Sequence, residues 1–205
     1  MTHQPLNNEI PTYRVSFWEL SFIVMGALSL ISASVVGIGI KALNNAFNPA
    51  RAEAIAKSIF DYQIPGGSKG SFGVNIGSVK LARVQSAKNP PDIFLLVGKL
   101  PLNKETDREE LNKGDEPPPD TSDEEFNVTA SRIENKVFCG KTVPVTIKEG
   151  KQSLSNLPSP LPAIRYIVSL TETDAERVVI LTTNGTNAQE KAVAVFNSLR
   201  CHHSK

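Results

Sequence analysis

The chain has 205 residues, of which 40% are hydrophobic and 21% charged, and its formal net charge is +1. This composition is typical of a globular protein and excludes a wholly disordered, collagen-like or disulfide-dense chain. The average conceals three unlike segments, which are a long apolar run, an acidic insert and a folded remainder.

The apolar run lies near the amino end. Residues 20–40 contain no charged side chain, and Glu19 and Lys41 bound them. A helix over this run is roughly 31 Å long at about 1.5 Å per residue, which matches the hydrocarbon core of a bilayer. We therefore predict an N-terminal tail over 1–16 and one transmembrane helix over 17–42, with the lipid bilayer as the first partner.

Small residues follow one face of this predicted helix. Gly26, Ser29, Ala33 and Gly37 recur at steps of three or four residues. Small side chains let two helix backbones approach closely in lipid. They are the predicted packing face for another transmembrane helix or a membrane complex.

Two rules disagree on the side of the membrane that the rest of the chain occupies. Arg14 precedes the run, whereas Lys41, Arg51 and Lys57 follow it, so the positive-inside rule favours a cytoplasmic domain. A short tail, one span and a large domain are instead typical of a signal anchor with an exported domain. We expect a single-pass membrane protein whose domain is extracytoplasmic, that is, periplasmic or lumenal.

The acidic insert interrupts the folded part. Residues 103–125 include ten acidic side chains but only three basic ones, Lys104, Arg108 and Lys113. Three consecutive prolines lie among them. Without apolar periodicity such a segment cannot bury enough surface to offset its ordering entropy. It is a predicted disordered loop, which could bind the mildly basic remainder of the chain or a basic partner.

The remainder, residues 48–200, is predicted to be one α+β domain, followed by a C-terminal tail at 201–205. Asn48 and Pro49 favour a helix start, and the last predicted helix begins with Asn187 and Glu190 in capping-box spacing. The intervening segments alternate in the manner of strands, with a bulge expected at Gly77-Ser78 and an edge strand or bulge at Pro144. This order predicts a mainly antiparallel sheet flanked by an N-terminal and a C-terminal helix.

Apolar residues recur on one face of each predicted helix. They also recur at alternate positions in the predicted strands around Cys139. The predicted inward residues are Ala52, Ile55, Ala56, Ile59 and Phe60 in the first helix, Ala192, Val195, Phe196 and Leu199 in the last, and Val137, Cys139, Val143, Val145 and Ile147 in the strands.

A glycine-rich stretch surrounds Lys69. Gly66, Gly67, Gly70, Gly73 and Gly77 could cradle a phosphate, but the Gly-Lys-Ser/Thr order of a P-loop is absent. We interpret them as turn and bulge glycines, and the sequence predicts no cofactor.

Cys139 and Cys201 are the only cysteines. Three alternatives remain open, namely a disulfide that joins the last helix to the sheet, two buried free thiols, or metal ligation through Cys201 with His202 and His203. The Cys-x-x-Cys spacing of redox and zinc sites is absent.

Catalysis has little support in the residue inventory. His3, His202 and His203 are the only histidines, and all lie in the tails, where no rigid scaffold would hold a catalytic base. The basic residues are scattered without interleaved aromatic rings, which argues against nucleic-acid binding.

Three stretches carry a family resemblance. The residues at 61–70, 90–97 and 195–201 (DYQIPGGSKG, PPDIFLLV and VFNSLRC) resemble segments of uncharacterised cyanobacterial single-span membrane proteins. The order of elements, with a terminal helix that ends in Phe-Asn-Ser-Leu, is also similar to the PsbP-like α/β sandwich of photosystem accessory proteins. The first resemblance brings no activity with it, and the second implies an accessory role at a membrane complex.

The sequence favours a membrane-tethered, non-catalytic binding or assembly module. One alternative is a membrane-bound enzyme without a His-based site. Another is a pilin-like structural subunit, because Phe17-Trp-Glu-Leu20 precedes an apolar helix, although Arg14 then stands where a pilin signal has glycine.

Overall fold

The computed structural model describes Met25 and residues 41–102, 125–155 and 157–201. The chain divides into two units, Met1–Leu43 and Asn44–Lys205. The span predicted at 17–42, with its packing face of Gly26, Ser29, Ala33 and Gly37, lies outside the described residues except at its end and at Met25, and so does nearly all of the acidic insert. Among the described residues, no helix has both the length and the hydropathy needed to cross a membrane.

The second unit is an α+β fold with a mainly antiparallel sheet, which confirms the predicted class. The seven strands of the sheet lie in the spatial order β2 (Ser68–Ile76), β3 (Val79–Ser86), β4 (Ile93–Pro101), β8 (Ala175–Asn184), β7 (Leu161–Thr171), β6 (Lys141–Gln152) and β5 (Phe126–Phe138). Every neighbouring pair is antiparallel. β2 and β5 are therefore the two edges.

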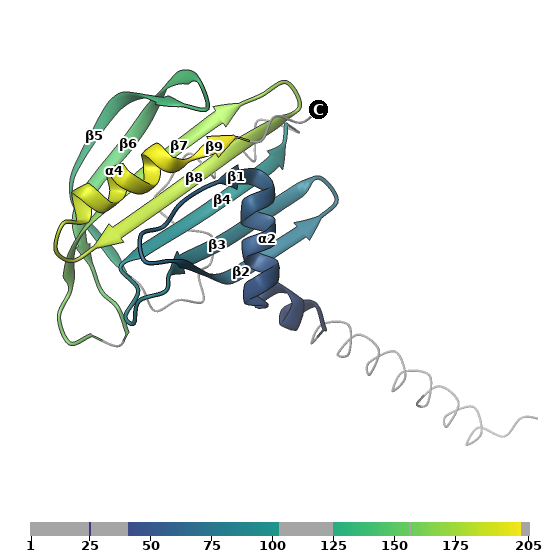
Figure 1. Cartoon of the computed structure of the whole chain (residues 1–205), viewed down its shortest axis with the longest axis horizontal. Coiled ribbons are helices and arrows are strands. Elements are labelled where there is room, and N and C mark those ends of the chain that lie inside the picture. The colour runs from purple at the N-terminus through teal and green to yellow at the C-terminus, as the bar shows by residue number, and fades with distance from the viewer. Residues whose placement is uncertain (1–24, 26–40, 103–124, 156, 202–205) are drawn as a thin grey trace, which may run out of the picture. The chain divides into compact units, whose positions relative to one another are not determined.

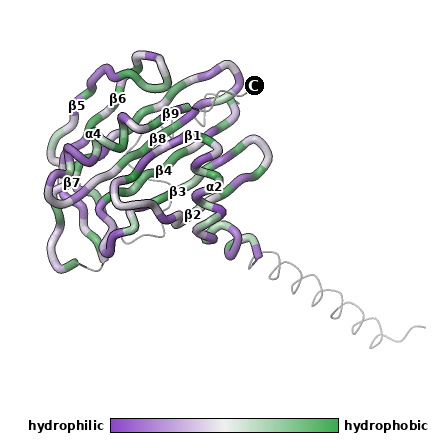
Figure 2. The backbone as a smooth tube through the Cα atoms, in the orientation of Figure 1, coloured by the Kyte–Doolittle hydropathy of each residue, from purple (hydrophilic) through white to green (hydrophobic). Residues whose placement is uncertain are grey.

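Both described helices of this unit cover the same face of the sheet (Figure 1). α2 (Pro49–Ile59) packs on β2 and β3, and α4 (Ala188–Ser198) packs on β7 and β8. Between them, β1 (Phe60–Asp61) pairs with β9 (Arg200–Cys201). The core fills the space between this layer and the sheet, and Figure 2 shows hydrophobic residues recurring along the central strands β4 and β8.

The start of α2 confirms the sequence prediction. Asn48 is the N-cap, and its Oδ1 accepts a hydrogen bond of 3.1 Å from the backbone N–H of Arg51. Pro49 occupies the first helical position, where a missing N–H costs least. The predicted inward residues are all buried, namely Ala52, Ile55, Ala56, Ile59 and Phe60.

α4 has the predicted inward face but not the predicted cap. Ala192, Val195, Phe196 and Leu199 are buried. Asn187, however, has a left-handed backbone with φ of 60° and makes no side-chain capping bond. An N-cap needs an extended backbone to aim its side chain at the first N–H groups, so the prediction of a capping box was wrong.

Two tight turns explain the errors in the strand predictions, which are a bulge expected at the first turn and a continuous phase expected across the second. Gly77 and Ser78 form a two-residue turn between β2 and β3, since Ile76 pairs with Val79, and the bulge lies instead between Gly70 and Phe72. Cys139 and Gly140, with φ of 52° and 77°, form the turn between β5 and β6, as two left-handed residues favour.

The second turn reverses which residues of β5 face the core. Phe138 is buried, whereas Val137 is 71% exposed. The prediction that Val137 shares the core phase of Val145 was therefore wrong. Pro144 lies in β6, which is an interior strand, but it pairs only with Asn135 of β5, because the pairing of β6 with β7 runs from Thr146 to Gln152.

Candidate functional site

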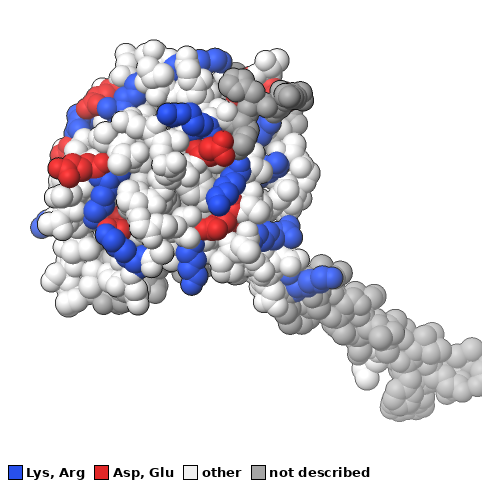
Figure 3. All heavy atoms as spheres, in the orientation of Figure 1, with Lys and Arg blue, Asp and Glu red and all other residues white. Residues whose placement is uncertain are grey.

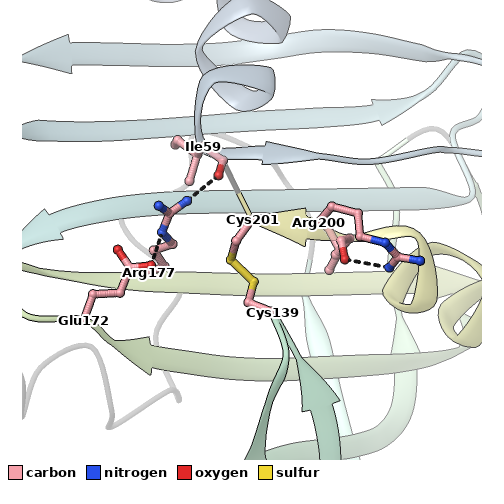
Figure 4. The surroundings of a disulfide bond; sticks show 7 residues. Ile59, Cys139, Glu172, Arg177, Arg200 and Cys201 are labelled. Carbon is pink, nitrogen blue, oxygen red and sulfur yellow. Dashed lines mark hydrogen bonds and ion pairs between the residues drawn. A yellow bond between two sulfur atoms is a disulfide. The ribbon is translucent and has the colours of Figure 1, made fainter. Parts of the chain in front are cut away.

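Cys139 and Cys201 are joined in a disulfide, with their Cα atoms 5.4 Å apart (Figure 4). The bond connects the β5–β6 turn to β9 and so to the end of the described chain. In this structure Cys201 is therefore not a free metal ligand, and His202 and His203 lie outside the described residues. Within the described part of the chain, no group of three or more His, Cys, Asp or Glu residues is arranged to hold a metal ion.

A buried guanidinium lies near the disulfide. Arg177 on β8 donates from Nη1 to the carbonyl oxygen of Ile59 at 2.6 Å, and its Nε lies 2.9 Å from Oε1 of Glu172 (Figure 4). Ile59 is the last residue of α2, where a cation stabilises the negative end of the helix dipole. Only 3% of Arg177 is exposed, so this group fixes α2 on the sheet and is poorly placed to meet a ligand.

A second polar group forms around Asp92, in the connection from β3 to β4. Its Oδ1 accepts a hydrogen bond of 2.8 Å from Ser86 Oγ. Its Oδ2 lies 2.7 Å from Lys88 Nζ and 2.9 Å from Lys191 Nζ of α4. Partial burial raises the pKa of Asp92, but the hydrogen bonds from Lys88, Lys191 and Ser86 outweigh burial and lower it to about 2.

This pKa disfavours acid catalysis, because a general acid needs a raised pKa rather than a lowered one. The carboxylate instead joins the sheet to α4 as a permanent anion. Because the pKa in the folded protein lies below the ordinary 3.8, the ionised group stabilises the fold above about pH 4, and that stabilisation is lost as the pH falls toward 2.

Lys191→Gln is expected to lower the free energy of unfolding at pH 7 by about 1 kcal/mol, since the Asp92–Lys191 pair is partly shielded from water. Lys88→Gln is the matched control. Lys88 binds the same oxygen, but its side chain is 58% exposed, against 20% for Lys191, so its loss should cost less. Denaturant titrations at pH 7, 4 and 2 measure the free energy of unfolding of each variant. The cost of Asp92→Asn should shrink between pH 4 and 2, and equal effects of the two lysine variants would contradict this account.

Tyr62 and its neighbours form a third polar group. Ser68 Oγ donates to Glu53 Oε1 at 2.8 Å. Burial raises the pKa of the Tyr62 phenol, which keeps the phenol neutral at physiological pH. Glu53 lies on α2 and Ser68 begins β2, so this hydrogen bond joins the helix to the edge strand beneath it.

The glycine-rich stretch has two roles, of which only the turns were predicted. Gly66, Gly67 and Gly77 have positive φ and lie in turns, as predicted. Gly70 and Gly73 instead face α2, and a Cβ at Gly73 would lie 2.7 Å from the Cα of Ala52. The second pair is therefore a packing surface for the helix rather than a phosphate cradle.

The edge strand β5 is exposed along most of its length. Every residue from 127 to 133 is exposed, and Ile133 and Val137 are 70% and 71% exposed. Among the described strands only β6 pairs with β5. Within the described part of the chain, its other side therefore presents backbone N–H and C=O groups to which a further strand can bind.

Charges of both signs alternate along β5. Glu134 lies 2.7 Å from both Arg132 Nε and Lys136 Nζ, and Arg132 also pairs with Glu149 of β6. Hydrogen bonds from Arg132 and Lys136 lower the pKa of Glu134, which holds it ionised. Figure 3 shows acidic and basic side chains interleaved along the rim of the domain where β5 lies.

Sequence reasoning missed this edge. The signal was present, because Arg132, Glu134 and Lys136 alternate with Ile133 and Val137, and such a strand has no face that is wholly apolar. What the sequence does not contain is the order of strands in the sheet, which makes β5 an edge.

Comparisons with known proteins add no family. No family model matches the chain. No curated protein sequence matches it significantly either.

Proposed function

We propose that this protein is a membrane-tethered, non-catalytic assembly module that binds a protein partner through the exposed edge of β5. The observation that carries the proposal is the exposure of a 13-residue edge strand with apolar side chains about 70% exposed at Ile133 and Val137. Monomeric proteins usually shield such an edge with proline, isolated charges or a covering loop. Partners commonly bind an edge of this kind by adding a strand.

The tether in this proposal comes from the amino-acid sequence. The uncharged run at 20–40 is long enough to cross a bilayer as one helix. A tether confines the domain to the membrane surface, which raises its effective concentration toward partners there. An accessory role at a membrane complex fits both features.

Export of the domain also belongs to the proposal. The disulfide between Cys139 and Cys201 supports it, because disulfides persist in oxidising compartments such as the periplasm or an oxidising lumen. The positive residues that follow the predicted span argue the other way, and the proposal gives the disulfide more weight.

A photoreactive residue at Ile133 or Val137 of the full-length protein in native membranes is expected to give the same discrete adduct from both positions. Ile76, at the end of β2, is the matched control, because it is 72% exposed and lies at the β2–β3 turn. The protein should also stay with the membrane fraction after an alkaline carbonate wash.

A blocking substitution makes this test specific. Val137→Lys places a cation on the edge, which opposes strand addition, and should abolish the adduct from Ile133, whereas Ile76→Lys should leave it unchanged. Equal adducts from Ile76 and Ile133 would contradict the assembly edge, and release of the intact chain by carbonate would contradict the tether.

A further inference from the structure

We infer that the partner of β5 is the β5 strand of a second copy of this chain, paired antiparallel in a register centred on Asn135. This inference rests on the proposed function, because it names the occupant of the same edge. It is argued from the alternation of side chains along β5, from their charges and from the position of a bulge.

The two faces of β5 differ in character. On the face toward the helices lie Arg132, Glu134 and Lys136, and the Lys136 ammonium is 5.8 Å from the ring centre of Tyr166, a core residue. Ile133, Asn135 and Val137 alternate with them and so lie on the opposite face. A strand that pairs with β5 meets charges on one face and apolar groups on the other.

Two-fold symmetry restricts the register of a self-paired strand. Directly opposite residues of an antiparallel pair point to the same face. One residue of β5 must therefore lie opposite its own copy, and the symmetry axis passes midway between the two. A register centred on Glu134 would place two carboxylates opposite each other and Arg132 opposite Lys136. A register centred on Lys136 would place two ammonium groups opposite each other, and like charges directly opposite are destabilising.

The register centred on Asn135 has neither conflict. It places Ile133 opposite Val137 of the second copy, and Glu134 opposite Lys136 of the second copy, twice each by symmetry. The two most exposed apolar residues of β5 then cover each other, and each charged pair has opposite signs. Cross-strand pairs of both kinds stabilise antiparallel sheets.

A register centred on Ile133 also avoids like charges opposite each other. It places Arg132 opposite Glu134 of the second copy, but it also places Val137 opposite Thr129. The register of β5 against β6 shifts between Val128 and Ala130, which puts Thr129 in a bulge. Bulges disrupt regular pairing, so the register centred on Asn135, which needs only residues 132–138, is favoured.

The test uses cysteine crosslinking of the full-length protein in membranes. With Asn135→Cys, mild oxidation is expected to give a covalent dimer, because opposite Cβ atoms lie about 5 Å apart. Ile133→Cys alone should crosslink far less, because the two copies of that residue lie roughly 13 Å apart, four residues out of register. Mixed copies with Ile133→Cys and Val137→Cys should crosslink to each other, and Ile76→Cys is the equally exposed control.

A charge exchange gives a second readout that does not depend on new cysteines elsewhere. In the Asn135→Cys background, Glu134→Lys should reduce crosslinking about tenfold, since it turns two attractive pairs into repulsive ones. Adding Lys136→Glu should restore the crosslink, because every cross-strand pair again has opposite signs.

The outcomes separate this inference from the proposed function. Self-crosslinking of Ile133→Cys above that of Asn135→Cys would overturn the register. Crosslinking of Asn135→Cys no faster than that of Ile76→Cys would overturn self-pairing. If self-pairing fails while the photoreactive residue at Ile133 still gives an adduct with a different protein, the proposed function stands and the second copy is not its partner.

Discussion

Replacing both Cys139 and Cys201 by serine is expected to lower the free energy of unfolding by about 4 kcal/mol. The two residues are 62 positions apart in the sequence, and a crosslink that closes a loop of this size removes chain entropy from the unfolded state worth about 4 kcal/mol. Domains of this size are stable by only about 5 to 15 kcal/mol. The loss is therefore a large share of the total stability.

The position of the disulfide explains why few other contacts would hold the C-terminal strand in its absence. β9 forms only the pairs Phe60 with Cys201 and Asp61 with Arg200. The bond attaches this short strand to the β5–β6 turn, next to Phe138, whose ring centre is 5.9 Å from that of Phe196. Without the bond, the C-terminal strand depends on two backbone pairs and on the packing of α4.

Denaturant titration of the full-length protein in detergent, followed by circular dichroism, measures this loss. Cys139→Ser and Cys201→Ser should each cost as much as the double variant, because either change removes the same bond. A loss below about 1 kcal/mol in the double variant would show that the bond does not constrain the unfolded chain. Additive losses would show that the two side chains act separately.

Local patterns in the sequence were sufficient to predict the buried face of each helix and the start of α2. Asn48 and Pro49 specify where α2 begins, and apolar residues at steps of three and four specify the face that it buries. α4 shows the limit of such patterns. Its apolar face is as predicted, but the backbone of Asn187 is left-handed because it follows the turn at Gly185, and no spacing of residue types reveals that.

The strand predictions at the two tight turns were wrong for one physical reason, since a reversal was read as a bulge at the first and missed at the second. In a hairpin with a two-residue turn, the flanking residues pair and so lie on the same face, although their numbers differ by three. The apolar phase must therefore reverse at Gly77-Ser78 and at Cys139-Gly140. A bulge produces the same reversal in the sequence, and only the pairing of the strands distinguishes the two.

Long-range information was missing for the candidate site. The exposed edge exists because β5, the fourth of the long strands in the chain, lies outermost in the sheet, beyond β6, β7 and β8. Strand order depends on which faces pack together over the whole domain. For the cysteines, spacing alone left three alternatives open, and the β5–β6 turn and β9 bring the two together in the structure.

Gly73→Ala is expected to lower the free energy of unfolding by about 2 to 4 kcal/mol, because overpacking forces the backbone of a well-packed layer to move. The new Cβ would lie 2.7 Å from the Cα of Ala52 and 3.1 Å from Cδ1 of Ile55. Both are on α2, and Ala52 is fully buried. The helix would have to lift from β2, which also exposes the neighbouring core.

Gly98→Ala on β4 is the matched control for this substitution. A Cβ there would meet Cδ1 of Leu81 at 3.4 Å and the backbone oxygen of Lys80 at 3.7 Å, which are ordinary contacts. Alanine also restricts the unfolded chain more than glycine, so this variant should be neutral or slightly stabilising. Denaturant titration of the two variants side by side makes the comparison.

A second substitution tests whether the helix backbone itself is the obstacle. Ala52→Gly removes the Cβ of Ala52, which would lie 3.2 Å from the new group at Gly73, but it leaves the nearer Cα at 2.7 Å. Ala52→Gly should therefore fail to rescue Gly73→Ala, and it should cost about 1 kcal/mol more for glycine inside a helix. Rescue by Ala52→Gly, or a cost of Gly73→Ala no larger than that of Gly98→Ala, would show that α2 can move away from β2 freely.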